Sequence, residues 1–177
     1  MTTIPILGLT RYSRLGPSSR LRTFQYADIL REYGLSLRLA PFFDDAYLRR
    51  RFAGTSRFGP QILRYYLRRL RAMQRPEDAA LLWIEKEALP WVPWLLERRA
   101  LPRHLAYVVD YDDATFHRYD RHRLAPVRRL LGQKIDRVMQ GAALVTAGRG
   151  NRGGAGGAAS HRDRSAALSC RTQTRQE

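Results

Sequence analysis

The chain is 177 residues long and 44% hydrophobic, which is enough for one domain with a real core. Its 32 basic and 16 acidic side chains give a net charge of +16, which favours an anionic partner such as nucleic acid, a lipid surface or a phosphorylated substrate. The alternative is that a GC-rich coding sequence enriches arginine on an ordinary solvated surface. The single cysteine, Cys170, excludes a disulfide framework, and the lack of both a signal-peptide pattern and an apolar run of about 18 residues leads us to expect a cytoplasmic protein.

The first part of the chain predicts a strand, a loop, a helix and a second strand. Residues 4–9 form a short apolar run, and the turn-forming residues 16–19 follow it. Apolar side chains then recur at helical spacing, and Gly34 is placed to end that helix. Residues 35–39 alternate apolar and polar side chains, as a half-buried strand does.

The rest of the chain continues this alternation of helices and strands. Residues 58–75 carry apolar side chains at steps of three and four, with arginines on the other face, and so predict an amphipathic helix. Three further apolar runs predict strands, and helical patterns separate them. In chain order these elements are a strand at 79–84, a helix at 90–99, a strand at 104–109, a helix at 124–139 and a strand at 142–146.

Strands that alternate with helices imply right-handed crossovers, which place the strands parallel in one sheet with helices on both faces. We therefore expect an α/β fold with a doubly wound, mostly parallel Rossmann-like sheet, formed by residues 1–147 as a single domain. Residues 148–177 are rich in glycine, alanine and arginine without an apolar period, which predicts a disordered tail. Because such sheets bind ligands beyond the carboxyl ends of their strands, function is expected in the loops that follow the strands.

The loop at residues 11–20 leads from a strand end into a helix N-terminus. Free backbone N–H groups and the helix dipole favour an anion there, such as a phosphate or a sugar carboxylate. The loop lacks both the Gly-Lys-Ser/Thr ending of a Walker A loop and the GxGxxG pattern. We take Gly16, Ser18, Ser19 and Arg20 as candidate substrate-binding residues; the alternative is that Ser18 or Ser19 simply caps the helix.

Three carboxylates follow the strand at 104–109 directly. Asp110, Asp112 and Asp113 can there accept hydrogen bonds from sugar hydroxyls, act as a base, or hold a divalent metal. The alternative is that one of them caps a short helix while another pairs with a nearby arginine.

Two glutamates and two histidines are further candidates near the same predicted cleft. Glu85 and Glu87 follow the strand at 79–84; the alternative is a role as helix N-terminal charges or salt-bridge partners. His117 and His122 can take part in acid-base chemistry, although histidines in an arginine-rich loop are also typical surface residues. We include His117 among the candidate substrate-binding residues.

The arginine-striped helix at 58–75 has two interpretations. Cationic side chains beside an aromatic and aliphatic face can lie on an anionic membrane. Packing of that apolar face against the sheet explains the same pattern. We expect packing as the main role and peripheral contact with the inner face of the membrane as an additional one.

Several segments, in a fixed order, resemble one protein family. The small-residue loop with the Phe-Gln-Tyr that follows it, the Pro-Phe-Phe-Asp-Asp segment, the exit of the third strand, the acidic strand end and the last strand look like parts of one domain. That domain is the N-terminal half of bacterial family 4 glycosyltransferases of the GT-B type. The segments lie at 16–26, 41–48, 82–90, 108–114 and 143–148.

The resemblance implies an enzyme that transfers a sugar from a nucleotide-sugar, with retention at the anomeric carbon, to an acceptor held mainly by this domain. It implies that Gly16 and residues 18–20 line the cleft and that Asp110, Asp112 and Asp113 lie on the acceptor side. Asp112 and Asp113 are the expected catalytic residues. Enzymes of this type generally need no bound metal, so no cofactor is expected.

A second, C-terminal domain binds the nucleotide-sugar in this family. From about residue 148 the sequence departs from the family pattern and looks like a GC-rich gene read out of frame. We therefore expect a truncated or frameshifted glycosyltransferase that is inactive as this fragment. The expected partners are a sugar acceptor, and a nucleotide-sugar only if a C-terminal domain is supplied, without specific nucleic acid. The alternative function is a basic binding protein for nucleic acid or an anionic membrane surface.

Overall fold

The computed structural model of the chain describes residues 3–55, 59–111 and 117–147. Its centre is a five-stranded sheet in the order β2-β1-β3-β4-β5, and every described pairing is parallel. The predicted α/β, doubly wound, Rossmann-like fold is therefore confirmed, while the predicted disordered tail lies outside the described residues. The strands are β1 (Ile4–Leu9), β2 (Leu35–Leu39), β3 (Leu81–Glu85), β4 (Ala106–Tyr111) and β5 (Leu144–Ala147).

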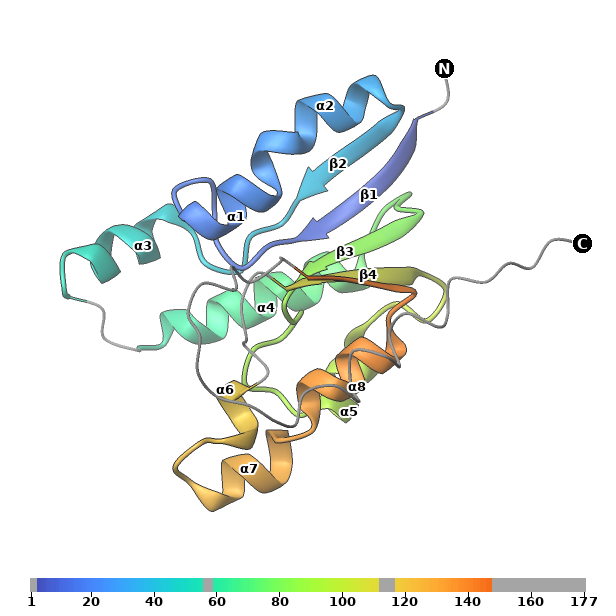
Figure 1. Cartoon of the computed structure of the whole chain (residues 1–177). Helices are drawn as coiled ribbons and strands as arrows, with labels where there is room; N and C mark the ends of the chain where they lie inside the picture. Colours follow the sequence, from blue (N-terminus) through green and yellow to red (C-terminus); the bar gives the residue numbers. More distant parts are fainter. Residues whose placement is uncertain (1–2, 56–58, 112–116, 148–177) are drawn as a thin grey trace, which may run out of the picture.

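Helices cover both faces of the sheet (Figure 1). The helix α1 and the helix α2 lie against one face, over β1 and β2, whereas α4, α5 and α8 lie against the opposite face. Two helical layers around a parallel sheet are the outcome expected of right-handed crossovers. The helical segments are α1 (Pro17–Arg22), η1 (Phe24–Tyr26), α2 (Ala27–Glu32), α3 (Asp45–Phe52), α4 (Gln61–Gln74), α5 (Trp94–Ala100), α6 (His117–Asp120), α7 (Ala125–Leu131) and α8 (Lys134–Gly141).

The main core lies between the sheet and the layer of α4, α5 and α8. Neighbours in register point to the same face, so Leu7 and Leu82 form one row. Leu9, Ile84 and Val109 form the next row, and all of these side chains are fully buried. Burying an aliphatic side chain of this size contributes about 1.5–3 kcal/mol. The apolar rows on this face are therefore the main source of stability for the central strands.

A second cluster, mostly aromatic, fixes the loops after β1 and β2. Phe43 stacks on Tyr47 with 3.9 Å between ring centroids. The backbone of Phe43 also donates a hydrogen bond to the Arg11 carbonyl and accepts one from the Ser13 N–H, each at 3.0 Å. The loop after β1 is thus held beside the loop after β2, just past the sheet edge. The buried members of this cluster are Phe42, Phe43, Tyr47, Leu48 and Tyr65.

Two helices that the sequence predicts as continuous are divided in the structure. Gly132 and Gln133 separate α7 from α8 within the predicted helix at 124–139. The first predicted helix breaks at Thr23, whose φ of −133° leaves the helical region, and it continues as η1 and α2. Gly34, with a φ of +75°, ends α2 as predicted, because glycine adopts this left-handed conformation without steric cost.

Candidate functional site

The topology marks one position at the carboxyl edge of the sheet. The chain passes from β1 to β2 on one side and returns to β3 on the other, so the strand order reverses between β1 and β3. Connections after two such strands run to opposite faces, and open α/β sheets bind ligands in the space between them. The predicted site residues in the loop after β1 and at the ends of β3 and β4 all belong to this edge.

Glu85, the last residue of β3, holds the loop after β1 in place. Its carboxylate accepts hydrogen bonds from Ser19 Oγ at 2.6 Å, from Ser18 Oγ at 2.9 Å and from the Arg11 N–H at 3.0 Å. The residue is 2% exposed. Hydrogen bonds to an ionised carboxylate are about twice as strong as neutral ones. Glu85 is therefore well satisfied by its own chain and acts on the loop as an anchor.

The start of α1 differs from the predicted capping pattern. Gly16 is the N-cap residue and no side chain caps the helix, so the alternative that Ser18 or Ser19 is the cap is wrong. Ser19 is buried, and its Oγ accepts the Tyr12 N–H at 3.0 Å while donating to Glu85. A Cβ atom at Gly16 would lie 2.4 Å from the Tyr12 Cβ, so this loop can close only around a glycine.

Asp110, in β4, makes the second connection between α1 and the sheet edge. Its carboxylate accepts hydrogen bonds from Nε and Nη2 of Arg22, with 2.6 Å to Nε, and from Thr146 Oγ1 at 2.6 Å. Arg22 comes from α1 and Thr146 from β5. The loop of candidate residues that leads into α1 is thus fixed at the ends of both β3 and β4.

Glu87 is the centre of a buried ionic cluster on the other side of the edge. Its carboxylate accepts hydrogen bonds from Tyr119 at 2.8 and 2.9 Å and lies 2.8 Å from Lys134 Nζ. Arg118 Nη1 lies 3.3 Å from it. Lys134 is also 2.8 Å from Glu97, and both of these side chains are inaccessible to solvent. The cluster joins the exit of β3 to α5, α6 and α8, which places Glu87 in a supporting role.

Burial shifts the titration of this cluster. Burial raises the pKa of Glu97, although the neighbouring Lys134 acts in the opposite direction. Burial, and then the charge of Glu87, raise the pKa of Tyr119, so its phenol remains a hydrogen-bond donor at neutral pH. The neutral Tyr119 phenol thus keeps its hydrogen bonds to the Glu87 carboxylate.

A tight turn at Lys86 sends Glu85 and Glu87 to different sides. The Glu87 N–H donates to the Glu85 carbonyl at 2.8 Å, and the φ of Lys86 is +66°. This three-residue γ-turn places a non-glycine residue in a sparsely populated region, at a cost of about 1–3 kcal/mol. Such strain persists only where the surroundings enforce it, and here the two carboxylate clusters do so.

Arg69 of α4 adds a buried positive charge below the end of β1. It is 3% exposed, donates to the Thr10 carbonyl, and lies 5.5 Å from the centre of the Phe42 ring. Its Nε and Nη1 atoms have no hydrogen-bond partner among the described residues. Among the described residues, basic side chains outnumber carboxylates at this edge, which favours an anionic ligand. The groups are Arg11, Arg22, Arg69, Lys86, Arg118 and Lys134 against Glu85, Glu87, Glu97 and Asp110.

The remaining predicted site residues are less closely connected. Arg20 is exposed on α1. His117 begins α6, and the acid it contacts in the described structure is Asp120 of the same helix, at 3.0 Å. Asp112 and Asp113, the expected catalytic residues, lie outside the described residues, so their role stays a prediction.

The sequence analysis did not identify five side chains that form these contacts, namely Arg22, Arg69, Glu97, Tyr119 and Lys134. Arg69 had a visible signal, because it interrupts the apolar stripe of its helix. Lys134 had a weaker one, because only one other lysine occurs in the chain. The sequence could not indicate that Arg69 donates to the Thr10 carbonyl or that Lys134 pairs with two glutamates, since these partners lie tens of positions away.

The described residues hold no group of three or more histidine, cysteine, aspartate or glutamate side chains that could bind a metal ion. Within the same residues, no helix has the length and apolar character needed to cross a membrane. No protein-family model matches this chain, and no curated protein matches it significantly.

Proposed function

We propose that this chain is the acceptor-side half of a GT-B glycosyltransferase of the family 4 type. The observation that carries the proposal is the attachment of the 16–20 loop to the ends of β3 and β4, through Ser18 and Ser19 on Glu85 and through Arg22 on Asp110. Three of the five segments that resemble the family, 16–26, 82–90 and the described part of 108–114, are thus in contact beside the reversal of strand order.

The contacts separate the residues of this edge into those that hold the structure and those that are available to an acceptor. Glu85, Glu87 and Asp110 are occupied by partners of the same chain, so we assign them to holding the loop and the backbone in shape. Contact with the acceptor then falls to exposed groups of the first loop, such as Arg20, and to Asp112 and Asp113 as the predicted catalytic pair. The excess of basic groups among the described residues favours an acceptor that carries negative charge.

Sugar transfer needs donor and acceptor to be held together in reacting geometry, and this positioning supplies much of the rate enhancement. The described residues form one Rossmann-like sheet, whereas a GT-B cleft lies between two. The proposal therefore requires a nucleotide-sugar-binding domain in addition to the described residues. Sequencing the genomic locus tests this requirement, because a downstream frame should encode a second Rossmann-like domain.

The activity of the purified chain is a direct test. It is incubated with UDP-, GDP- and ADP-sugars and a panel of sugar acceptors, and release of the nucleoside diphosphate is measured against a blank without protein. The proposal predicts no release above the blank. Turnover of any of these donors by the chain alone would refute it.

A second candidate function is binding to an anionic surface, and an observation on α4 favours it. Arg64 and Arg71 of α4 are exposed, so part of the net charge is available to a partner. Specific nucleic-acid recognition is not part of either proposal.

A further inference from the structure

A small cavity lies between α4 and the loop that follows β2. Its volume is about 130 Å³, and it is lined by Ala40, Pro41, Arg68, Arg69 and Ala72. Pockets for drug-sized ligands measure about 300–1,000 Å³, whereas one water molecule takes up about 30 Å³. The cavity therefore suits an ion or a single functional group rather than a whole nucleotide-sugar.

Arg69 brings a buried positive charge to this cavity. It is 3% exposed, and its Nη2 donates to the Thr10 carbonyl. Its Nε and Nη1 have no hydrogen-bond partner among the residues that the structure describes. Burial lowers the pKa of Arg69 to about 9, so the guanidinium keeps its charge at neutral pH. A buried charge with donors left over is unfavourable unless an anion lies nearby.

The carboxylates whose charges favour the charged form of Arg69 are those of Glu85 and Glu97. Both are held by other groups. The Glu85 carboxylate accepts hydrogen bonds from the loop after β1 and from the start of α1, and Glu97 lies 2.8 Å from Lys134. The chain therefore offsets the charge of Arg69 only in part.

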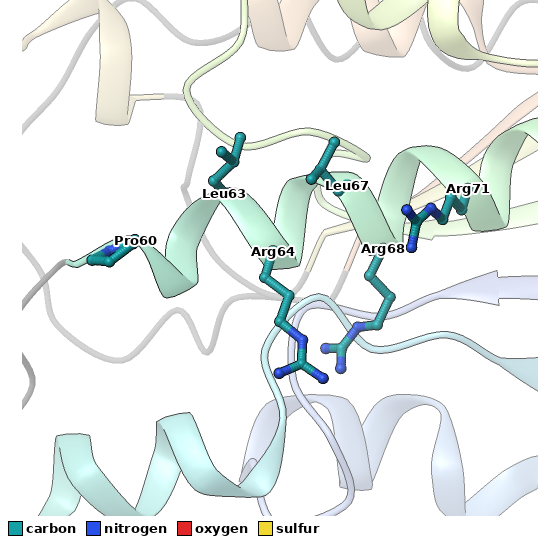
Figure 2. A pocket seen from close by; sticks show the side chains of 6 residues that line it. All are labelled: Pro60, Leu63, Arg64, Leu67, Arg68 and Arg71. Carbon is teal, nitrogen blue, oxygen red and sulfur yellow. The ribbon is translucent and has the colours of Figure 1, made fainter.

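Arg68 adds a second charge that is more accessible. Its side chain is 45% exposed, and its Nη1 lies 3.6 Å from Asp44, which is too long for a hydrogen bond. Its Nη2 donates to the Phe42 carbonyl at 2.9 Å and so keeps the side chain beside the loop after β2. Figure 2 shows Arg68 on the same side of α4 as Arg64, opposite the two labelled leucines. The positive charges of α4 thus gather on the side that carries Arg68.

We propose that this cavity binds a small oxoanion of the phosphate class, held by Arg68 and Arg69. Two guanidinium groups supply the charge and the N–H donors that phosphate oxygens accept. The volume admits inorganic phosphate or the terminal phosphoryl group of a larger molecule. The helix α1, with the loop assigned to the acceptor, lies against the other face of the sheet from α4 (Figure 1). The inference therefore goes beyond the proposed glycosyltransferase role and does not depend on it.

Thermal melts of the full chain with inorganic phosphate test the proposal. At constant ionic strength, set with sodium chloride, Tm should rise with phosphate concentration and then level off. The rise should reach about 5–10 °C at a concentration about 100-fold above Kd. General stabilisation by excluded anions keeps growing with concentration, so saturation identifies binding. A rise that does not saturate, or no rise at all, would overturn the proposal.

Two variants assign the binding to the cavity. Arg69→Met removes the buried charge at similar side-chain length, and Arg68→Gln removes the accessible one. Each should raise the phosphate concentration at half-maximal effect by at least about tenfold, because each removes charged hydrogen-bond donors. Arg69→Met also removes the donor to the Thr10 carbonyl, whereas Arg68→Gln changes an exposed position and leaves the fold intact. An unchanged response in Arg68→Gln contradicts the assignment.

Arg71→Gln is the matched control. It makes the same change of charge at an exposed position of the same helix, outside the set of residues that lines the cavity. The response to phosphate should change little. A loss equal to that of Arg68→Gln would show attraction by net charge alone and would count against a built site.

The side-chain Nε–H signal of Arg69 in the isotope-labelled chain gives an independent measurement, and its absence from Arg69→Met assigns it. This signal should move with phosphate and saturate at the same concentration as Tm. A signal that stays fixed while Tm rises would place the phosphate elsewhere. Repeating the titration with glucose 6-phosphate distinguishes the two sources of the anion, since tighter binding than that of inorganic phosphate identifies the phosphoryl group of a larger molecule.

Discussion

Replacing Lys134 with methionine tests the ionic cluster behind the sheet edge. Methionine keeps most of the side-chain length but removes the charge that lies 2.8 Å from both Glu87 and Glu97. Glu87 keeps the hydroxyl of Tyr119 and the guanidinium of Arg118, so the loss falls mainly on Glu97. Removing one partner of a buried ion pair costs about 3–5 kcal/mol. We expect the free energy of unfolding to fall by about that amount.

Urea unfolding, followed by tryptophan fluorescence and far-UV circular dichroism, measures this change. The midpoint should move while the slope stays constant, because the surface exposed on unfolding is unchanged. The double variant Lys134→Met with Glu97→Gln should recover part of the loss, since it leaves fewer uncompensated charges in the core. A loss below about 1 kcal/mol for Lys134→Met would refute the cluster as a buried ion pair.

The penalty in this variant should also depend on pH. A carboxyl group with a pKa raised on folding contributes stability below its unfolded-state pKa and loses that contribution as pH rises through the folded-state pKa. Burial already raises the pKa of Glu97 above 4.5, and loss of Lys134 raises it further. The deficit should therefore shrink as pH falls from neutral toward about 4.5. A deficit that is the same at every pH contradicts this cause.

Three further predictions concern the loops. Ser19→Ala removes a 2.6 Å bond to the Glu85 carboxylate and should cost about 2–3 kcal/mol in a thermal melt, whereas Ser18→Ala, at 2.9 Å, should cost about 1 kcal/mol. The reverse order would count against the anchoring role. Gly16→Ala places a methyl group 2.4 Å from the Tyr12 Cβ, which forces this loop to open. Amide hydrogen exchange in the loop should therefore become faster. An unchanged exchange rate would disprove the close approach. Burial acts to raise the pKa of Asp44, but hydrogen bonds from Tyr47 and Tyr65 and the charges of Arg68 and Arg50 together outweigh it, so this pKa is lowered. The stability that Asp44 contributes is present above its unfolded-state pKa and is lost as pH falls through its folded-state pKa. Asp44→Asn should therefore make the fall in stability below about pH 4 less steep. An unchanged dependence of stability on pH in this range would contradict this role of Asp44.

The strands were predictable because their apolar runs have no competing pattern. The predicted residues 4–9 and 35–39 match β1 and β2, and the other three strands shift by about two residues toward the C-terminus. Helix ends were harder, because they depend on tertiary contacts. The helix predicted at 90–99 begins only at Trp94, since the preceding segment is held by buried contacts of Leu89 and Pro90.

The candidate site was predictable in its position but not in its contacts. The order of strands and helices was enough to gather Ser18, Glu85 and Asp110 at one edge. The sequence could not indicate that these carboxylates are satisfied internally, because their partners are separated from them by 66 positions for Ser19 and 88 for Arg22. The sequence analysis also predicted no helix at 45–52, although Asp44, which caps α3, belongs to the residue types preferred at that position.

We propose that the loop after β1 and the carboxyl ends of β3 and β4 form one ligand-binding edge. Backbone amide shifts of the isotope-labelled chain, titrated with hexoses and hexose phosphates, test it most directly. We expect saturable changes in amide chemical shift at residues 11–20, 85–87 and 110, with larger changes for hexose phosphates than for hexoses. Saturable shifts confined to α4 or to the opposite edge of the sheet, or an absence of shifts with every sugar, would contradict it.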